Sequence, residues 1–80
     1  RLDAATLVEL FGWSEQQFND RLAGNPIRRI GHERWLRNIA VALGNGPATT
    51  EARQALVQRQ EHPSLLVREH VAWSLRRLGA

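Results

Sequence analysis

The sequence of 80 residues contains no cysteine, methionine, lysine or tyrosine. The absence of cysteine excludes disulfide bonds, thiolate nucleophiles, zinc fingers and iron–sulfur ligation within these residues. No apolar run approaches the ~20 residues of a membrane-spanning helix, and no signal or transit segment is present. We therefore expect a cytoplasmic protein with no membrane contact. Because the chain starts at Arg1 and contains no methionine, we also expect a fragment of a longer polypeptide.

The spacing of apolar residues predicts an all-α fold. Only three prolines occur, and no stretch alternates between apolar and polar residues as a strand does. Helix-spaced apolar residues and capping signals predict five helices, at residues 3–11, 15–22, 32–43, 50–60 and 65–78, and a single turn at residues 26–30. A chain of this length buries only about 60% of its unfolded surface. We expect one small domain over residues 1–80, as a monomer.

The predicted helices have apolar stripes that indicate which faces are buried. The stripes are Ala4, Leu7, Val8 and Phe11; Leu36, Ile39, Ala40 and Leu43; Ala52, Ala55 and Leu56; and Val67, Val71, Ser74, Leu75 and Leu78.

Local signals mark several helix ends. Ser14 and Gln17 have the spacing of a capping box, and Trp13 and Phe18 that of a hydrophobic staple. Asn25 followed by proline is typical of an N-cap, and Gly24 suits a left-handed helix terminus. Residues 44–47 (GNGP) predict that the preceding helix stops at residue 43.

Two segments of the sequence resemble each other. Residues 38–43 (NIAVAL) align with residues 70–75 (HVAWSL) at an offset of 32. A period in this range is typical of stacked helical hairpins, in which each hairpin needs a neighbour to cover its apolar face. Residues 67–75 also resemble the second helix of a HEAT repeat. The sequence therefore predicts a short α-solenoid of HEAT-like helical hairpins.

The sequence offers no candidate active site. His32, His62 and His70 lack the spacing of a helical zinc motif, so we expect no metal site. Ser14 and Ser64 occupy predicted N-caps. The glycines occur singly at helix ends, without a phosphate-binding loop, and the eight acidic residues are scattered.

The remaining candidate is a cluster of arginines. All eleven basic side chains are arginine, and the formal net charge is +3. Arginine suits bidentate phosphate contacts and stacking on bases, although drift in a GC-rich genome would give the same composition. The residues predicted to contact RNA are Arg28, Arg29, Arg34, Arg37 and Asn38, with Arg68 and His70 extending the surface.

The roles of the arginines and of Trp35 each leave an alternative open. The arginines can form ion pairs instead, with Glu33, with Glu69 or with residues of another domain. Trp35 has the position to stack on a base, but its spacing with Ile39 and Ala42 favours a place in the core.

The sequence resembles the C-terminal region of epoxyqueuosine reductases over residues 2–78. The central part of the resemblance is residues 24–31 (GNPIRRIG), Arg34, residues 36–38 (LRN) and residues 42–45 (ALGN). Residues 62–64 (HPS) and 67–73 (VREHVAW) resemble the HEAT-like repeat that closes those enzymes. Asn25 departs from the small residue expected there.

The resemblance implies a parent enzyme that reduces the epoxide of epoxyqueuosine in tRNA with cobalamin and 4Fe–4S clusters. It implies that both cofactors belong to an upstream iron–sulfur domain and that this fragment carries no catalysis. Its implied task is to hold the tRNA anticodon arm. The alternatives are a scaffold that braces the upstream domain and a HEAT-type module that binds other proteins.

Overall fold

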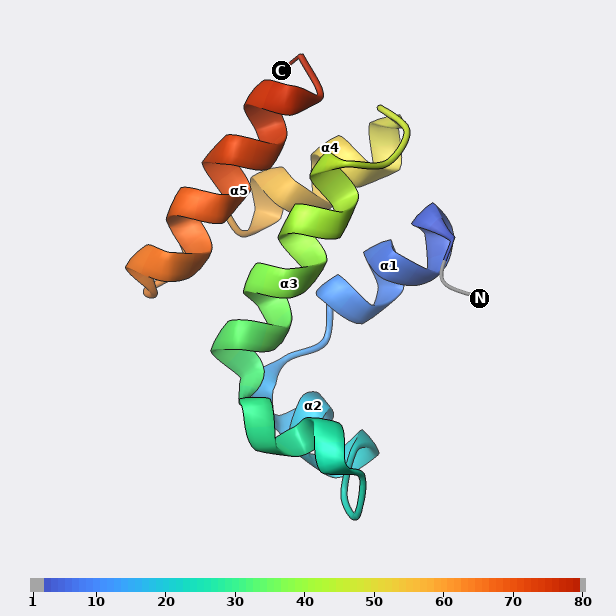
Figure 1. The fold of residues 1–80 in the computed structure, drawn as a ribbon, viewed down its shortest axis with the longest axis vertical. Coiled ribbons are helices and arrows are strands. Elements are labelled where there is room, and N and C mark those ends of the chain that lie inside the picture. Colours follow the sequence, from blue (N-terminus) through green and yellow to red (C-terminus); the bar gives the residue numbers. More distant parts are fainter. Residues whose placement is uncertain (1–2, 80) are drawn as a thin grey trace.

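The structure is a computed structural model that describes residues 3–79, and these residues form five α-helices and one short 3₁₀-helix (Figure 1). The elements are α1 (Ala4–Phe11), α2 (Glu15–Arg21), η1 (Pro26–Ile30), α3 (His32–Gly44), α4 (Thr50–Gln58) and α5 (Leu65–Arg77). No strand occurs in this part of the chain, which confirms the predicted all-α class and the five helices. Among the same residues, every helix is too short or too polar to cross a bilayer.

The helices begin where the capping signals predict. Ser14 and Gln17 form a complete capping box: Gln17 N donates to Ser14 Oγ at 3.1 Å, and Ser14 N donates to Gln17 Oε1 at 2.9 Å. Ile27 N donates to the Asn25 side chain at 2.9 Å, so Asn25 caps η1 as predicted. Gly24 has φ = 79°, the left-handed conformation expected after α2.

One predicted boundary is wrong for a structural reason. Gly44 was expected to end the helix before it, but Gly44 belongs to α3 and Asn45 caps that helix. Glycine is required here by a neighbouring helix, because a Cβ at this position would lie 2.9 Å from Ser74 Cα on α5. The predicted ends of α4 and α5 are also slightly long, since these helices stop at Gln58 and Arg77.

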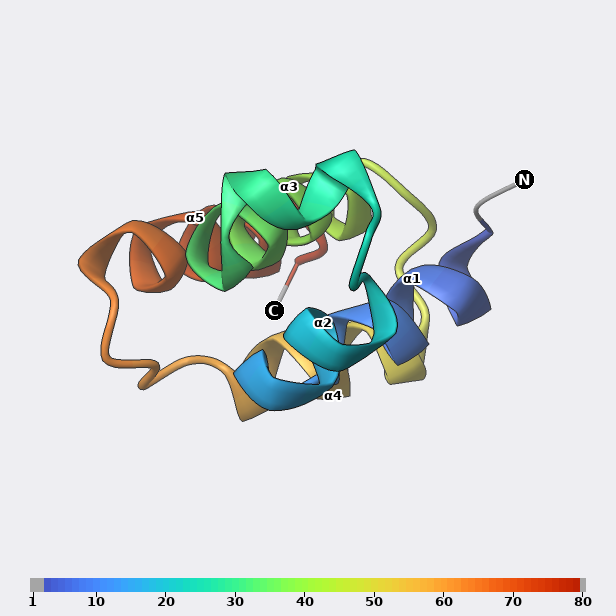
Figure 2. The same ribbon diagram turned by 90° about the horizontal axis from the view of Figure 1, so that it is seen from below.

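The helices form two layers (Figure 2). In the first layer α3 and α5 lie side by side and make the most extensive helix–helix contact. In the second layer α1 lies against α4, and both also contact the first layer. The end of the molecule at which α3 begins carries α2 and η1.

Three hydrogen bonds show that α3 and α5 run parallel and in register. Ser64, the N-cap of α5, donates to the Glu33 carboxylate; Ser74 donates to Ala40 O; and Arg77 Nε donates to Gly44 O. The paired residues are separated by 31, 34 and 33 positions in the sequence. This near-constant separation matches the offset of 32 between the two similar sequence segments.

The core lies between the two layers. The hydrophobic residues of this core are Phe11, Leu36, Ile39, Ala40, Leu43, Ala52, Leu56, Val67, Val71, Leu75 and Leu78. The predicted stripes of α3 and α5 are confirmed, including Ser74, which is fully buried. The predicted stripe of α1 is confirmed only at Phe11, because Leu7 and Val8 pack against the edge of the core and remain partly exposed.

The contact between Gly44 and Ser74 predicts the effect of a single methyl group. Gly44→Ala places Cβ 2.5 Å from Ser74 Oγ and 2.9 Å from Ser74 Cα, so α3 and α5 must separate. Overpacking of this kind costs about 1–3 kcal/mol. Urea unfolding should show this loss for Gly44→Ala. In the control Gly46→Ala the new Cβ meets no atom closer than 3.5 Å, and stability should change little. Equal unfolding midpoints for the two variants would contradict the argument.

Candidate nucleic-acid interface

The arginine cluster is divided between two elements by Gly31. Gly31 has φ = 85°, a conformation that L-residues rarely adopt, and it turns the chain from η1 into α3. Arg28 and Arg29 therefore belong to η1, whereas Arg34 and Arg37 belong to α3.

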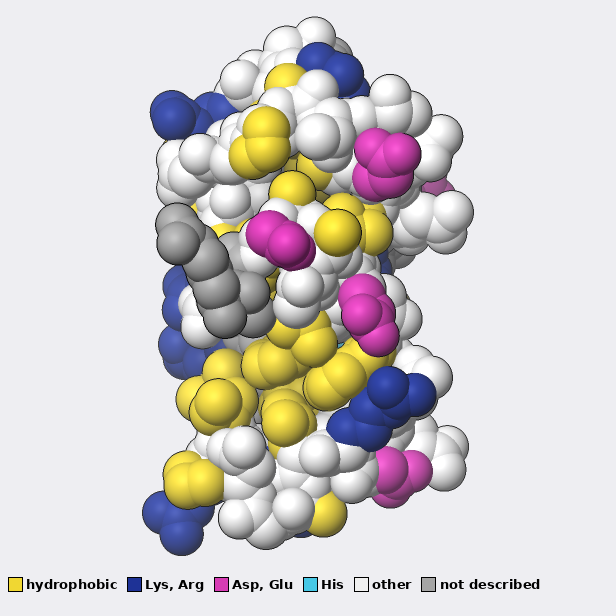
Figure 3. All heavy atoms as spheres, turned by 90° about the vertical axis from the view of Figure 1, so that its right-hand side faces the viewer, with side chains coloured by type: hydrophobic (Ala, Val, Ile, Leu, Met, Phe, Trp, Pro, Cys, Tyr) yellow, Lys and Arg dark blue, Asp and Glu magenta, His cyan; other side chains and the backbone are white. Residues whose placement is uncertain are grey.

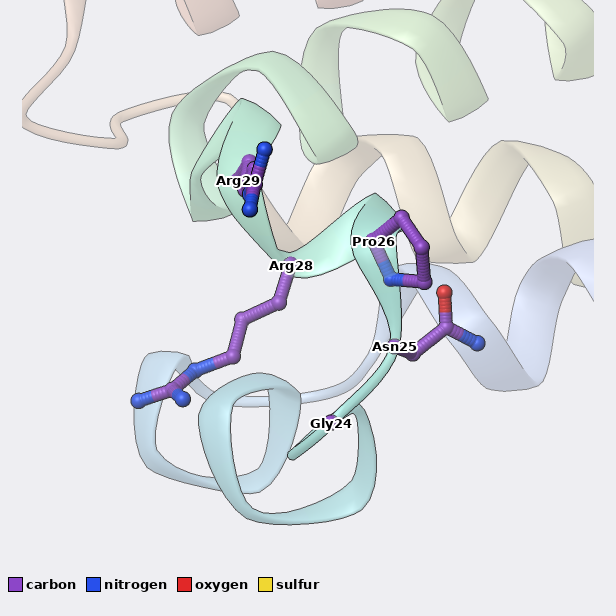
Figure 4. Close-up of a pocket in the computed structure, with 5 residues that line it drawn as sticks. All are labelled: Gly24, Asn25, Pro26, Arg28 and Arg29. Carbon is purple, nitrogen blue, oxygen red and sulfur yellow. The ribbon is translucent and has the colours of Figure 1, made fainter.

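A hollow of about 550 Å³ lies beside η1, lined by Gly24, Asn25, Pro26, Arg28 and Arg29. Figure 4 shows that the two arginine side chains leave η1 in different directions, with that of Arg28 reaching toward α2. Arg28 Nε donates to Asn19 Oδ1 at 3.4 Å. The η1 arginines thus border one hollow without facing each other across it.

On α3, Arg34, Arg37 and Asn38 share one face. They are three and four residues apart, so their side chains lie next to each other on the helix surface. Arg37 Nε donates to Asn38 Oδ1 at 2.7 Å. This face is turned away from the buried stripe of α3, and Arg34 and Asn38 are exposed.

The hydrogen bonds of Arg28 and Arg37 test the alternative that the arginines form ion pairs with carboxylates of this chain. Arg28 and Arg37 donate to amide oxygens of asparagine, which carry no charge. The carboxylate of Glu33 accepts a hydrogen bond from the Ser64 hydroxyl. These bonds leave the positive charge of Arg28 and Arg37 available to an anion.

Arg68 and His70 lie on different sides of α5. Arg68 Nη1 donates to His62 O at 2.8 Å and Pro63 O at 2.9 Å, so Arg68 holds the loop before α5. His70 Nδ1 donates to Leu66 O at 2.8 Å, and its ring borders a groove shared with Val41 of α3. Residues two apart on an α-helix are about 200° apart around its axis. The structure therefore places His70 in a groove with Val41 of α3 and Arg68 on another side of α5.

Arg59 is a residue whose importance the sequence did not indicate. Its guanidinium donates to Phe11 O at 3.1 Å and Trp13 O at 2.9 Å, and it lies 5.8 Å from the centre of the Phe11 ring. Burial lowers the pKa of Arg59. The contact joins α4 to the loop after α1 across 46–48 residues, a separation at which no local pattern predicts a contact.

Trp35 is partly buried and packs against the core, the side of the helix that its spacing with Ile39 and Ala42 favours. Its ring stacks on Trp13, with centroids 5.7 Å apart and planes at 16°, and lies 5.2 Å from the Phe18 ring. Trp35 Nε1 donates to Leu10 O at 3.2 Å. The predicted staple residues Trp13 and Phe18 thus both meet Trp35.

The histidines near this cluster act as hydrogen-bonding groups. His32 Nε2 donates to Trp13 O at 2.8 Å. His62 Nδ1 accepts from Ser64 N at 3.0 Å, which requires an unprotonated nitrogen. Burial lowers the pKa of His62, as do the nearby positive charges of Arg59, His32 and Arg68, whereas Glu33 raises it.

Comparison with known proteins gives one consistent result. No family model and no solved structure matches the chain. Among curated proteins, it is 59% identical over 78 residues to the epoxyqueuosine reductase of Pseudomonas aeruginosa, 56% identical over 78 residues to that of Xanthomonas campestris and 55% identical over 75 residues to that of Escherichia coli. The chain is similar to a segment of epoxyqueuosine reductases.

These matches include 92–98% of this chain but only 19–22% of the reductases. The chain thus spans about a fifth of the length of the epoxyqueuosine reductases that it matches.

The Arg59 contact predicts a loss of stability when its donors are removed. Arg59→Met keeps most of the aliphatic stem but removes the donors to Phe11 O and Trp13 O. Trp13 O keeps its hydrogen bond from His32, whereas Phe11 O loses its side-chain donor. Leaving a partly buried acceptor unsatisfied costs about 1–3 kcal/mol, which urea unfolding would measure. The exposed Arg34→Met is the control and should unfold near the midpoint of the unchanged chain. Unfolding of both variants at the same urea concentration would rule out the proposed role of Arg59.

The environment of His62 predicts that stability depends on pH. Because the pKa of folded His62 is below the ordinary 6.5, its contribution is fully present above pH 6.5. That contribution is lost as the pH falls through the lowered pKa of the folded state. His62→Asn keeps an acceptor for Ser64 N but does not titrate. Thermal melts at pH 5–7.5 should show a shallower loss of stability for His62→Asn, and parallel curves would refute this explanation.

Proposed function

We propose that this chain is a non-catalytic helical module of an epoxyqueuosine reductase and that it helps to bind the anticodon arm of tRNA. The observation that carries the proposal is the similarity to these reductases over 98% of the chain at 59% identity. In this proposal the chain works in the cytoplasm, within a tRNA queuosine-biosynthesis enzyme.

The fold that we propose is a single HEAT-like domain over residues 1–80. The parallel, in-register pairing of α3 with α5 supports it, because stacked helical hairpins place equivalent helices side by side at a constant sequence offset. The helix between them in the sequence is α4, which lies in the other layer (Figure 2).

The surface proposed for RNA is the exposed face of α3 together with the hollow beside η1. Arg34, Arg37 and Asn38 supply adjacent donors on α3, and Arg28 and Arg29 supply donors at the end where α3 begins. Guanidinium groups bind phosphate in a bidentate way, and helical surfaces recognise RNA mainly by shape, phosphate and splayed loop bases. His70 adds to the α3 surface from α5. Arg68, which holds a loop of its own domain, is the weakest member of the set.

The cofactors of the family do not fit the residues of this chain. The chain has no cysteine to ligate a 4Fe–4S cluster, and the described residues contain no group of three or more side chains suited to a metal. We therefore assign neither the clusters nor cobalamin to these residues and derive no catalytic step from them. An upstream iron–sulfur domain of the same polypeptide is the proposed partner that carries the chemistry.

The second candidate function is a scaffold that braces that domain. Figure 3 shows apolar side chains gathered across the middle of the face on which α1 lies. Leu7 and Val8 of α1 are only partly covered, and together with Ala4, Ala5 and Pro47 they line shallow hollows. An apolar surface of this kind favours contact with another protein domain.

The RNA-binding proposal predicts a change in salt dependence. The double variant Arg34→Ala/Arg37→Ala in the complete reductase should weaken binding to the tRNA. The slope of log K against log salt should become shallower by about one unit for each arginine, because each releases counterions on binding phosphate. Filter binding at several salt concentrations would measure both effects.

The matched control changes the net charge by the same amount elsewhere. Gln54→Glu/Gln58→Glu adds two negative charges on α4, in the opposite layer. Its salt slope should stay close to that of the unchanged protein. If the arginine variant keeps full affinity but melts at a lower temperature, the RNA surface on α3 is refuted, and these arginines contact the upstream domain instead.

A further inference from the structure

A groove of about 410 Å³ runs between the outer faces of α3 and α5. Val41 lines it from α3, and α5 contributes Glu69, His70, Trp73 and Arg76. The buried stripe of α5, which includes Val71 and Ser74, faces the core, so these groove residues lie on the outer side of the α3–α5 layer. The volume falls within the ~300–1,000 Å³ of small-molecule binding sites.

Trp73 packs against the side chain of Arg77 in this groove. The guanidinium of Arg77 lies 5.0 Å from the centre of its ring, and Arg77 Nε donates to Gly44 O at 3.3 Å. Arg77 is therefore tied to the end of α3 and supports the indole from one side. An aromatic ring ordered before binding loses little conformational entropy when a planar ligand stacks on it. Trp13 and Trp35 differ from Trp73, because they stack on each other.

The polar groups of the groove favour a nucleobase over a phosphate. Glu69 places a carboxylate in the groove, which repels phosphate but accepts hydrogen bonds from the exocyclic amino group of a base. In neutral His70 the Nδ1 hydrogen is used by Leu66 O, which leaves Nε2 as a second acceptor. Arg76 adds a cation at the border of the groove, suited to the sugar–phosphate chain beside a bound base.

The groove is continuous with the proposed RNA surface. Arg37 precedes Val41 by four residues on α3, so the two side chains are neighbours along one face of the helix. An RNA strand whose phosphates contact Arg34 and Arg37 would pass the groove at Val41, which lies about one turn of α3 further on.

We infer that this groove binds one unpaired base of RNA, stacked on Trp73, with its exocyclic amino group directed to Glu69. The ligand class is adenine, guanine or cytosine in a single-stranded loop, since uracil has no such amino group. This inference rests on the proposed function and names the site at which the module reads a base rather than the backbone.

The test uses the complete reductase and an RNA hairpin with the sequence of the anticodon arm. Stacking of a base on an aromatic ring contributes enough that Trp73→Leu should weaken binding about 5- to 150-fold. Trp73→Phe keeps an aromatic face and should weaken it less. Neither variant removes a charge, so the salt slope should not change, in contrast to Arg34→Ala/Arg37→Ala.

An abasic scan of the hairpin loop identifies the base. Removing the base that stacks on Trp73 should weaken binding to the unchanged enzyme but have little further effect on Trp73→Leu. Val41→Phe is the second variant, for use if Trp73→Leu lowers the melting temperature. It fills the groove from α3 without altering Trp73 and should also weaken binding to the hairpin.

The outcomes separate the two proposals. If Trp73→Leu and Val41→Phe bind the hairpin as tightly as the unchanged enzyme, or if every abasic position weakens all forms equally, the base site is refuted and the arginine surface is unaffected. If Arg34→Ala/Arg37→Ala also leaves affinity and salt slope unchanged, the proposed function fails as well. A reductase that does not bind the hairpin at all overturns both.

Discussion

The close contact between α3 and α5 at Gly44 and Ser74 determines where the candidate site residues of these helices lie. Gly44 has no side chain, so the backbone of α5 approaches α3 at a distance that a methyl group would prevent. Ser74 is fully buried at this point, and its hydroxyl donates to Ala40 O, which satisfies the polar group without water. The two helices are thereby fixed in parallel and in register.

This register brings residues of both helices to one outer surface. The hydrogen bonds between the helices pair residues 31–34 positions apart along their length. His70 and Trp73 of α5 therefore lie at the height of Asn38 and Val41 of α3, and the face of α3 that carries Arg37 leads into the groove between the helices. A shift of one helical turn along α5 would separate these groups.

A second constraint orients α2 and η1. Side chains from α3 and α4 hold the carbonyl groups at the end of α1 and in the loop that follows: Trp35 binds Leu10 O, and Arg59 and His32 bind Trp13 O. These donors add side-chain hydrogen bonds to carbonyls at the end of α1 and in the loop after it. Because the loop is fixed, the hollow beside η1 stays at the end of the molecule where α3 begins.

Local signals in the sequence predicted the elements, and one internal similarity indicated stacked helical hairpins. The caps at Ser14 and Asn25 depend on residues only two or three positions away, so they could be read directly from the sequence. The similarity between residues 38–43 and 70–75 anticipated the offset at which α3 and α5 pair. Gly44 was misread because a glycine that ends a helix and a glycine that permits close packing look alike in the sequence.

The arrangement of the candidate site was less predictable. Four arginines within ten residues suggested one RNA-binding surface, but the direction of the chain after Gly31 depends on a positive φ and on the packing of α2 against α3. Arg59 lacked any signal, since its partners Phe11 and Trp13 are more than 40 residues away. Arg68 and His70 are two residues apart in sequence, and only the helical geometry of α5 separates them.

The two layers expose surfaces of different chemical character. The outer face of α3 and α5 carries arginine, asparagine and the Trp73 groove, whereas the α1 face carries partly covered alanine, leucine and valine. The arginine-rich face suits a polyanion, and the apolar face suits a protein domain. Because these surfaces belong to different layers, contact with an upstream domain through α1 would leave α3 and α5 free for RNA. The proposed scaffold and RNA-binding functions are therefore compatible in one enzyme. Substitutions on the α1 face would test the first, and substitutions on the outer face of α3 and α5 would test the second.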